Sequence, residues 1–212
     1  MWRFEAGAWL FIRLVLGVSW VRAGWEKLDD PGWTAEPRGK AISGFLQGAI
    51  AKSTAGPHPE VPHWYHTLVQ EVFLPNATLL AVLVTYGELL VGIALIVGLL
   101  TRFSALAGVT MNLAFVWAGT TSTNPPMLLL GLALAFFGHH AGRFGLDGWG
   151  VPWAAARLPG QVKRLGHEML FVLALLAAAA LALAVSGAET WAAMAVLALI
   201  VTTGATWRHN AS

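Results

Sequence analysis

Apolar stretches about as long as a membrane span recur throughout this chain. A helix needs about 20 mostly apolar residues to cross the hydrocarbon core of a bilayer. Six segments meet that requirement: residues 7–28, 77–100, 103–121, 124–141, 168–186 and 190–207. Because they recur along the whole length, a signal peptide does not explain them. The sequence therefore predicts an all-α, multi-pass membrane helix bundle with six spans.

The composition supports a membrane protein. Of the 212 residues, 57% are hydrophobic and 11% are charged, whereas a soluble domain carries about 25% charged residues. The chain therefore has the lipid bilayer as its main partner. Lys and Arg number 13 against 11 Asp and Glu. This small excess is better interpreted as a signal of membrane topology than as a nucleic-acid-binding surface.

The basic residues of the loops assign the two sides of the membrane. With six spans, both termini, the turn after the second span and the loop after the fourth share one face. That face carries Arg3, Arg102, Arg143, Arg157, Lys163, Arg164 and Arg208. The positive-inside rule therefore predicts cytoplasmic termini in the plasma or inner membrane, with the 29–76 segment outside.

Two regions outside the spans divide the chain further. The extracytoplasmic segment 29–76 contains "PHWYHTLVQEVFLPN", where Trp64, Leu68 and Val72 recur at helical spacing. This predicts a short helix on the outer membrane surface or over the mouth of the bundle. The Gly-, Pro- and Arg-rich stretch after the fourth span predicts two parts. These are a four-helix core in residues 1–150, and a cytoplasmic linker plus transmembrane hairpin in 151–212.

Two charged residues fall inside predicted spans. Arg13 lies in the first and Glu88 lies at the centre of "LLAVLVTYGELLVGIALIVGLL". Ionisable groups in spans are costly and usually face the bundle interior. Helical geometry places Gly17, Trp20, Gly24 and Lys27 on the face of Arg13. It directs Arg22 to the opposite face, where Glu26 follows at i+4 and can pair with it.

The second and third spans offer partners for Arg13. Glu88 shares its face with Thr85 and Gly92, and Asn112 lies on a small-residue face of the third span. We expect a buried Arg13–Glu88 pair with Asn112 in the same network. Two interpretations stay open, because such a pair can serve chemistry or simply fasten the bundle. Asn112 alone is also typical of hydrogen bonding between helices.

The absence of cysteine excludes several redox centres. With no Cys in the sequence, Cys-ligated metals, iron–sulfur clusters and covalently attached haem are excluded. Histidine is absent from the middle of the spans, so we expect no haem b. Outside them, His58, His63 and His66 with Glu60 could bind zinc or copper, or could be ordinary interfacial residues, since they meet no signature spacing.

Three stretches together resemble the DoxX/DoxD-like family of small bacterial and archaeal membrane proteins. They are "RLVLGVSWVRAGWEKL", "GELLVGIALIVGLLTRFSALAGVTMNLAFVWAGTTSTNPP" and "GRFGLD". The resemblance covers roughly residues 7–148, four of the six spans, and leaves out the predicted hairpin at 168–207.

The resemblance implies membership of a membrane oxidoreductase system, since the best-known members of that family are subunits of thiosulfate:quinone oxidoreductase. The implied cofactor is a membrane quinone, and the implied partner is a soluble or membrane redox subunit. Arg13 and Glu88 are then the candidate catalytic residues, and Trp20, Tyr86 and Asn112 join them as candidate quinone-binding residues.

Two other classes of function are compatible with the sequence. The chain could be a non-catalytic scaffold of a larger respiratory or redox complex. It could also be a small transporter or proton pathway, which the intramembrane Glu88 permits. Transporters often show inverted repeats and broken helices. Neither is evident in this sequence, so the third class is the least favoured.

Overall fold

The computed structural model describes residues 2–35, 37–138, 140–150 and 153, and every regular element in this part of the chain is helical. The elements are α1 (Trp2–Asp29), α2 (Pro31–Thr34), α3 (Lys40–Ser53), α4 (His63–Leu68), the π-helical turn η1 (Val69–Phe73), α5 (Ala77–Val97), α6 (Thr101–Trp117) and α7 (Asn124–Phe137). The all-α prediction is confirmed for these residues. The predicted hairpin at 168–207 and its linker lie outside the described residues.

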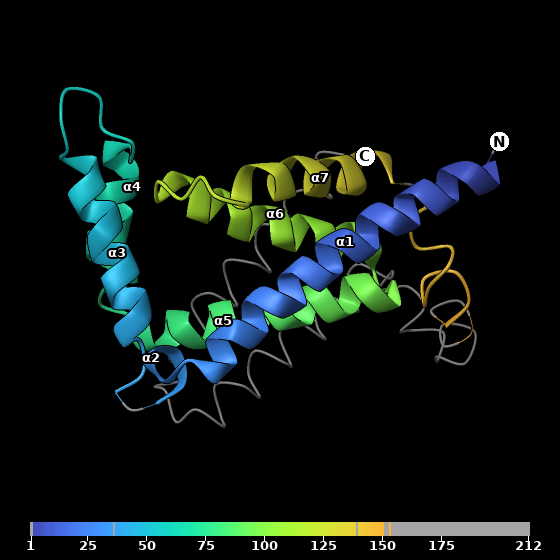
Figure 1. The fold of residues 1–212 in the computed structure, drawn as a ribbon, viewed down its shortest axis with the longest axis horizontal. Coiled ribbons are helices and arrows are strands. Elements are labelled where there is room, and N and C mark those ends of the chain that lie inside the picture. Colours follow the sequence, from blue (N-terminus) through green and yellow to red (C-terminus); the bar gives the residue numbers. More distant parts are fainter. Residues whose placement is uncertain (1, 36, 139, 151–152, 154–212) are drawn as a thin grey trace, which may run out of the picture.

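Four long helices occupy the positions of the first four predicted spans. α1 packs chiefly against α5, and α6 packs against both α5 and α7 (Figure 1). By length and composition, Glu5–Asp29 and Ala77–Val97 are long and apolar enough to cross a membrane. Asn124–Phe137 is a shorter apolar helix. Membrane crossing by α6, α7 and the hairpin stays a prediction.

The outward faces of these helices are apolar. Water would penalise such a surface, whereas the hydrocarbon of a bilayer would not. Among the exposed large side chains are Phe11, Val18, Trp25, Ile93, Leu129, Phe136 and Phe137. The surface therefore suits helices that face lipid.

Glycines bring α1 and α5 into backbone contact. A Cβ atom on Gly92 would lie 2.6 Å from the Val21 nitrogen and 2.8 Å from the Gly17 oxygen. A Cβ atom on Gly24 would likewise lie 2.7 Å from Cγ of Leu89. Close backbone approach at small residues is how helices associate in lipid. The predicted inward faces of both helices are confirmed at these positions.

The segment between α1 and α5 forms a lid over one end of the bundle. In Figure 1, α3 and α4 stand across the ends of α6 and α7. The Tyr65 hydroxyl donates to the Ala114 oxygen at 2.7 Å, and Lys52 Nζ donates to the Gly119 oxygen at 2.6 Å. Trp64 meets Trp117 edge to face, with ring centroids 4.9 Å apart. This position corresponds to the second of the two predicted placements.

The buried face of the lid helix differs from the predicted one. Val61, Tyr65 and Val69 pack inward, and Leu68 of the predicted stripe is partly buried against the same core. The other two residues of that stripe are exposed, Trp64 by 52% and Val72 by 46%. Two features explain the difference. The hydroxyl of Tyr65 finds a carbonyl at the end of α6, which anchors that face, and the change to π-helical geometry at Val69 shifts the spacing of later residues.

We expect Gly92→Ala to lower the free energy of unfolding by about 1–3 kcal/mol, because an added methyl forces α1 and α5 apart. Thermal unfolding in detergent micelles measures the change. The control is Gly44→Ala in α3, where an added Cβ would meet nothing within 4 Å. It should be neutral or stabilising by roughly 0.5–1 kcal/mol. Equal effects of the two substitutions would contradict the close contact.

Tyr65 should make the stability of the lid depend on alkaline pH. Burial raises the pKa of Tyr65 to about 12, against about 10 in an unfolded chain. The stabilisation is therefore complete below pH 10 and is lost as the pH rises from about 10 to 12, at roughly 1.4 kcal/mol per unit. Unfolding measured at a series of pH values should show this loss. Tyr65→Phe should remove it, and Tyr86→Phe, which alters the other tyrosine of the chain, should leave it in place.

Candidate functional site

Arg13 fastens α1 to the loop that follows α7. Its Nη1 donates to the Ala141 oxygen at 2.8 Å and its Nη2 donates to the Phe144 oxygen at 3.4 Å. The side chain is fully buried. Gly98 and Gly145 flank the guanidinium so closely that a Cβ atom on either would overlap it. The planar fork of the guanidinium suits this task, because it can donate to two carbonyls at once.

Asp147 joins the same loop to the turn between α5 and α6. Its carboxylate accepts hydrogen bonds from the backbone nitrogens of Leu100 and Thr101, the latter at 2.8 Å. Its own backbone nitrogen donates to the Gly98 oxygen at 2.8 Å. Asp147 therefore caps the N-terminal end of α6.

The predicted Arg13–Glu88 pair is not formed. Glu88 pairs instead with Lys27, whose Nζ lies 2.7 Å from Oε2 of Glu88. Lys27 follows Arg13 by 14 residues on α1, which corresponds to about 21 Å along the helix axis. Arg13 and Glu88 therefore lie far apart along the bundle interior.

The reason for this difference is an offset along the helices. α5 continues past the end of α1, and its first turns, at Ala77 and Ala81, belong to the core of the lid. Glu88 is consequently level with the C-terminal end of α1. Helical periodicity identified the correct faces of Arg13 and Glu88, but it carries no information about their relative height.

The Lys27–Glu88 pair lies where the bundle meets α2. The Glu88 side chain is 1% exposed and the Lys27 side chain is 19% exposed. Lys27 Nζ also lies 3.4 Å from the Ala23 oxygen and 5.2 Å from the ring centroid of Trp33. The long stem of lysine lets its ammonium group reach both a buried carboxylate and the edge of the lid.

Three buried side-chain oxygens have no hydrogen-bond partner within the described part of the chain. Thr101 Oγ1 lies beside the Asp147 cap, where Arg13 Nε also has no partner among the described residues. The other two lie near Glu88, and they are Oγ1 of Thr85, one turn before Glu88, and Oδ1 of Asn112 on α6. A Cβ atom on Gly87 would lie 3.5 Å from the sulfur of Met111, so Asn112 is at about the level of Glu88. A buried polar atom left unsatisfied costs about 1–3 kcal/mol, so each such atom indicates a missing partner.

Trp20 provides an aromatic wall beside these polar groups. The residue is buried on the inward face of α1. Its indole lies against α6, where a Cβ atom on Gly108 would be 2.8 Å from Nε1. We refer to Trp20, Lys27, Thr85, Glu88 and Asn112 as the Glu88 cluster. Three predicted site residues, Trp20, Glu88 and Asn112, are thus buried on the inward faces of α1, α5 and α6, and Arg13 lies outside this set.

Tyr86 does not belong to the Glu88 cluster. It is 45% exposed. Two helical positions correspond to a rotation of about 200°, so Tyr86 points away from the interior that Glu88 faces.

The sequence did not identify Lys27 as the partner of Glu88. Lys27 shares the stripe of Arg13, and its position near the end of the span hid its role as the partner of Glu88.

The histidines of the lid do not converge on a common point. The rings of His63 and His66 stack with centroids 6.0 Å apart. The two ring nitrogens of His66 already face Ser53 Oγ at 2.5 Å and Gln70 Oε1 at 2.8 Å. Within the described ranges, no group of three or more His, Asp or Glu side chains is arranged to hold a metal ion.

Comparison with known proteins gives one match. The family model described as DoxX matches residues 8–121. No curated protein and no solved structure matches the chain. The matched segment contains every residue of the Glu88 cluster, and it ends before α7 and the loop that holds Arg13.

Double-mutant cycles should identify the true partner of Glu88. We expect Lys27→Met and Glu88→Leu each to lower the free energy of unfolding, by up to roughly 3–5 kcal/mol, because each leaves a charge unpaired in the interior. The Lys27→Met/Glu88→Leu double variant should recover most of that loss. Arg13→Leu combined with Glu88→Leu should be additive within about 0.5 kcal/mol. Strong coupling between Arg13 and Glu88 would contradict the arrangement.

Proposed function

The chain belongs to the DoxX family, and we propose that it is a membrane subunit of an oxidoreductase system that binds the headgroup of a membrane quinone at the Glu88 cluster. The observation that carries the proposal is the pair of unpartnered buried oxygens, Thr85 Oγ1 and Asn112 Oδ1, beside the Lys27–Glu88 pair. Both oxygens can form hydrogen bonds with a polar ligand, in a protein whose outer surface otherwise suits lipid.

The residues of the cluster fit such a headgroup. A bound quinone supplies two-electron, two-proton redox chemistry. The hydroxyl of Thr85 and the amide of Asn112 can each donate to a carbonyl oxygen or accept from a hydroxyl group. The two groups can therefore bind both the oxidised and the reduced form. Trp20 offers a flat apolar surface for a ring to pack against.

Lys27 and Glu88 are placed to hold and move a proton. A carboxylate and an ammonium joined at 2.7 Å share a hydrogen bond, and either can act as an acid or a base towards a neighbouring group. Lys27 is partly exposed at the edge of the lid. The pair therefore connects the buried cluster with the outer end of the bundle. Arg13, held by two carbonyls about 21 Å away, has no part in this chemistry.

This chain has no cysteine to carry thiol or iron–sulfur redox chemistry. We therefore propose a soluble or membrane redox partner subunit, in an arrangement like thiosulfate:quinone oxidoreductase. The multi-pass topology with cytoplasmic termini in the plasma or inner membrane belongs to the same proposal. It places the lid, and with it the edge of the Glu88 cluster, outside the cytoplasm.

A second candidate function is that of a scaffold without chemistry. Both inward-facing cations are already engaged, Arg13 by backbone carbonyls and Lys27 by Glu88. Charges neutralised within the protein can fix helix positions without any substrate. The scaffold interpretation leaves the two unpartnered oxygens unexplained, and this difference separates the two candidates experimentally.

Thr85→Val and Asn112→Leu test the quinone proposal. We expect each variant to be at least as stable as the parent, because the removed atom has no partner, and to bind quinone roughly 3- to 10-fold more weakly, because a hydrogen bond is lost. The probes are ubiquinone-1 and menadione, titrated into protein in lipid nanodiscs and detected by quenching of tryptophan fluorescence. Trp20→Phe should remove the part of the quenching that arises beside the site.

The matched control is Thr110→Val, on the exposed side of α6, where the hydroxyl donates to the Leu106 oxygen of the same helix. It should bind both probes like the parent. Failure of the parent protein to bind either quinone, or equal binding by all variants, would favour the scaffold function.

A further inference from the structure

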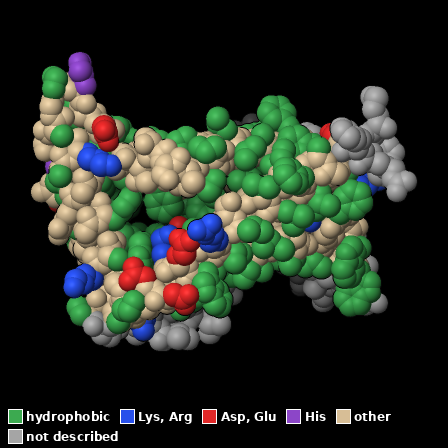
Figure 2. All heavy atoms as spheres, in the orientation of Figure 1, with side chains coloured by type: hydrophobic (Ala, Val, Ile, Leu, Met, Phe, Trp, Pro, Cys, Tyr) green, Lys and Arg blue, Asp and Glu red, His purple; other side chains and the backbone are tan. Residues whose placement is uncertain are grey.

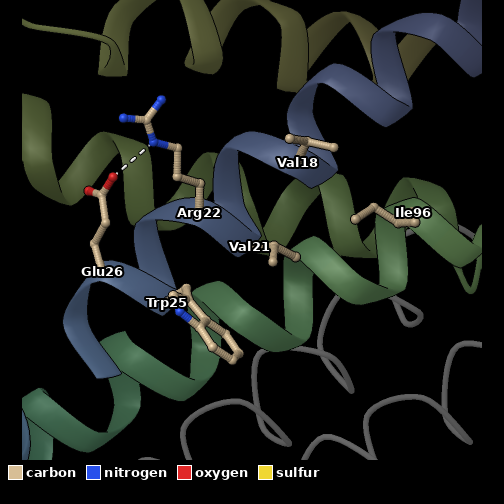
Figure 3. A pocket seen from close by; sticks show the side chains of 6 residues that line it. All are labelled: Val18, Val21, Arg22, Trp25, Glu26 and Ile96. Carbon is tan, nitrogen blue, oxygen red and sulfur yellow. Dashed lines mark hydrogen bonds and ion pairs between the residues drawn. The ribbon is translucent and has the colours of Figure 1, made fainter. Parts of the chain in front are cut away.

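A groove of about 420 Å³ lies on the outward side of α1 and α5, away from the Glu88 cluster. Its walls are Val18, Val21 and Trp25 of α1 and Ile96 of α5, and Arg22 and Glu26 lie at one end (Figure 3). The volume is within the range of roughly 300–1,000 Å³ that is typical of ligand pockets.

The groove lies on the two helices best suited to cross the membrane, α1 and α5. Its apolar walls suit contact with the hydrocarbon region of a bilayer. Figure 2 shows hydrophobic side chains along much of α1, while most of the visible acidic and basic side chains gather towards its α2 end. Arg22 precedes Asp29, the last residue of α1, by seven positions, about 10 Å along the axis. The charged end of the groove is therefore near the membrane surface.

Arg22 and Glu26 present two opposite charges to whatever fills the groove. Arg22 Nε donates to Glu26 Oε1 at 2.8 Å. The two terminal nitrogens of Arg22 point away from Glu26 in Figure 3, and within the described residues neither they nor Oε2 of Glu26 have an assigned partner. Both side chains are well exposed. The guanidinium can therefore donate to a phosphate in a bidentate manner, and the free carboxylate oxygen can accept from an ammonium group.

We propose that this groove binds one phospholipid with a zwitterionic amine headgroup, of the phosphatidylethanolamine type. Its phosphate lies on the terminal nitrogens of Arg22 and its ammonium group lies on Glu26. An acyl chain runs from there along Val21 and Val18 towards Ile96. Trp25 lies at the level where indole rings commonly meet lipid headgroups.

The charge pattern distinguishes this occupant from other lipids. A phosphatidylglycerol headgroup offers only negative charge and would leave Glu26 unpaired next to a phosphate. A phosphatidylcholine headgroup has a quaternary ammonium that cannot donate a hydrogen bond to Glu26. A second copy of the chain is also a poor fit, because a stable interface needs about 800 Å² from each partner, and six residues line the groove.

Native mass spectrometry of the full chain tests the proposal. The protein is extracted from mixed vesicles that contain phosphatidylethanolamine, phosphatidylcholine and phosphatidylglycerol in equal amounts, and the retained lipids are counted. We expect one phosphatidylethanolamine per chain, with at least a fivefold preference over the other two lipids. Val18→Trp, which fills the groove, and Arg22→Gln should each reduce retention at least fivefold.

Two further variants test the headgroup assignment. Glu26→Gln should abolish the preference for phosphatidylethanolamine over phosphatidylglycerol. Lys40→Gln removes an exposed cation outside the groove and should leave the retained lipids unchanged. Exposed pairs contribute at most about 1 kcal/mol to stability, so all of these variants should fold.

Three outcomes would overturn the proposal. The first is retention of all three lipids in the proportions of the vesicle, which indicates ordinary surrounding lipid. The second is a preference for phosphatidylglycerol in the parent protein. The third is a different occupant, either a second copy of the chain or a bound quinone that Val18→Trp displaces.

Discussion

Where Gly17 meets Gly92, the backbones of α1 and α5 approach closely enough that a methyl group would not fit between them. This contact fixes how far the two helices are displaced along each other. With Gly17 beside Ile96 and Gly24 beside Leu89, Lys27 reaches Glu88 at one end of the shared interface. At the other end, Arg13 lies against Gly98 and the loop around Gly145. The positions of Arg13, Lys27 and Glu88 therefore all follow from the contact between Gly17 and Gly92.

The chain neutralises its two buried cations in different ways, and the side chains suit the difference. Arg13 carries a delocalised charge on a planar fork, and its two terminal nitrogens donate to backbone carbonyls without a direct ion pair. Lys27 carries a compact charge on a flexible stem, and a carboxylate satisfies it at 2.7 Å. An ammonium–carboxylate pair can exchange protons with a guest, whereas a guanidinium held by carbonyls cannot. The Arg13 end of the interior therefore has groups that hold the helices together, whereas the Lys27–Glu88 end has groups that can transfer a proton.

Hydrophobic periodicity predicted the helices and most of their inward faces, including those of Arg13, Trp20, Glu88 and Asn112. It also predicted the exposed Arg22–Glu26 pair, which is formed at 2.8 Å. It could not predict which residues lie at the same height, because α1 and α5 are joined by the long 29–76 segment and no short turn sets their offset. Only the packed lid shows that α5 begins well beyond the end of α1. For this reason the prediction of an Arg13–Glu88 pair was wrong, and Lys27 was not recognised as the partner of Glu88.

Unpartnered buried oxygens carry a cost that distinguishes a binding site from a fastener. Each of Thr85 Oγ1 and Asn112 Oδ1 costs about 1–3 kcal/mol when it lacks a partner. A bundle built only to hold a complex together would be more stable with valine and leucine at these positions, since the Lys27–Glu88 pair already joins α1 to α5. Polar groups that destabilise the empty protein are typical of sites where a ligand supplies the missing hydrogen bonds. Thr101 Oγ1 and Arg13 Nε also lack a partner within the described residues. What singles out the Glu88 cluster as the proposed binding site is that its two unpartnered oxygens lie close to the Lys27–Glu88 pair, which can exchange a proton with a ligand.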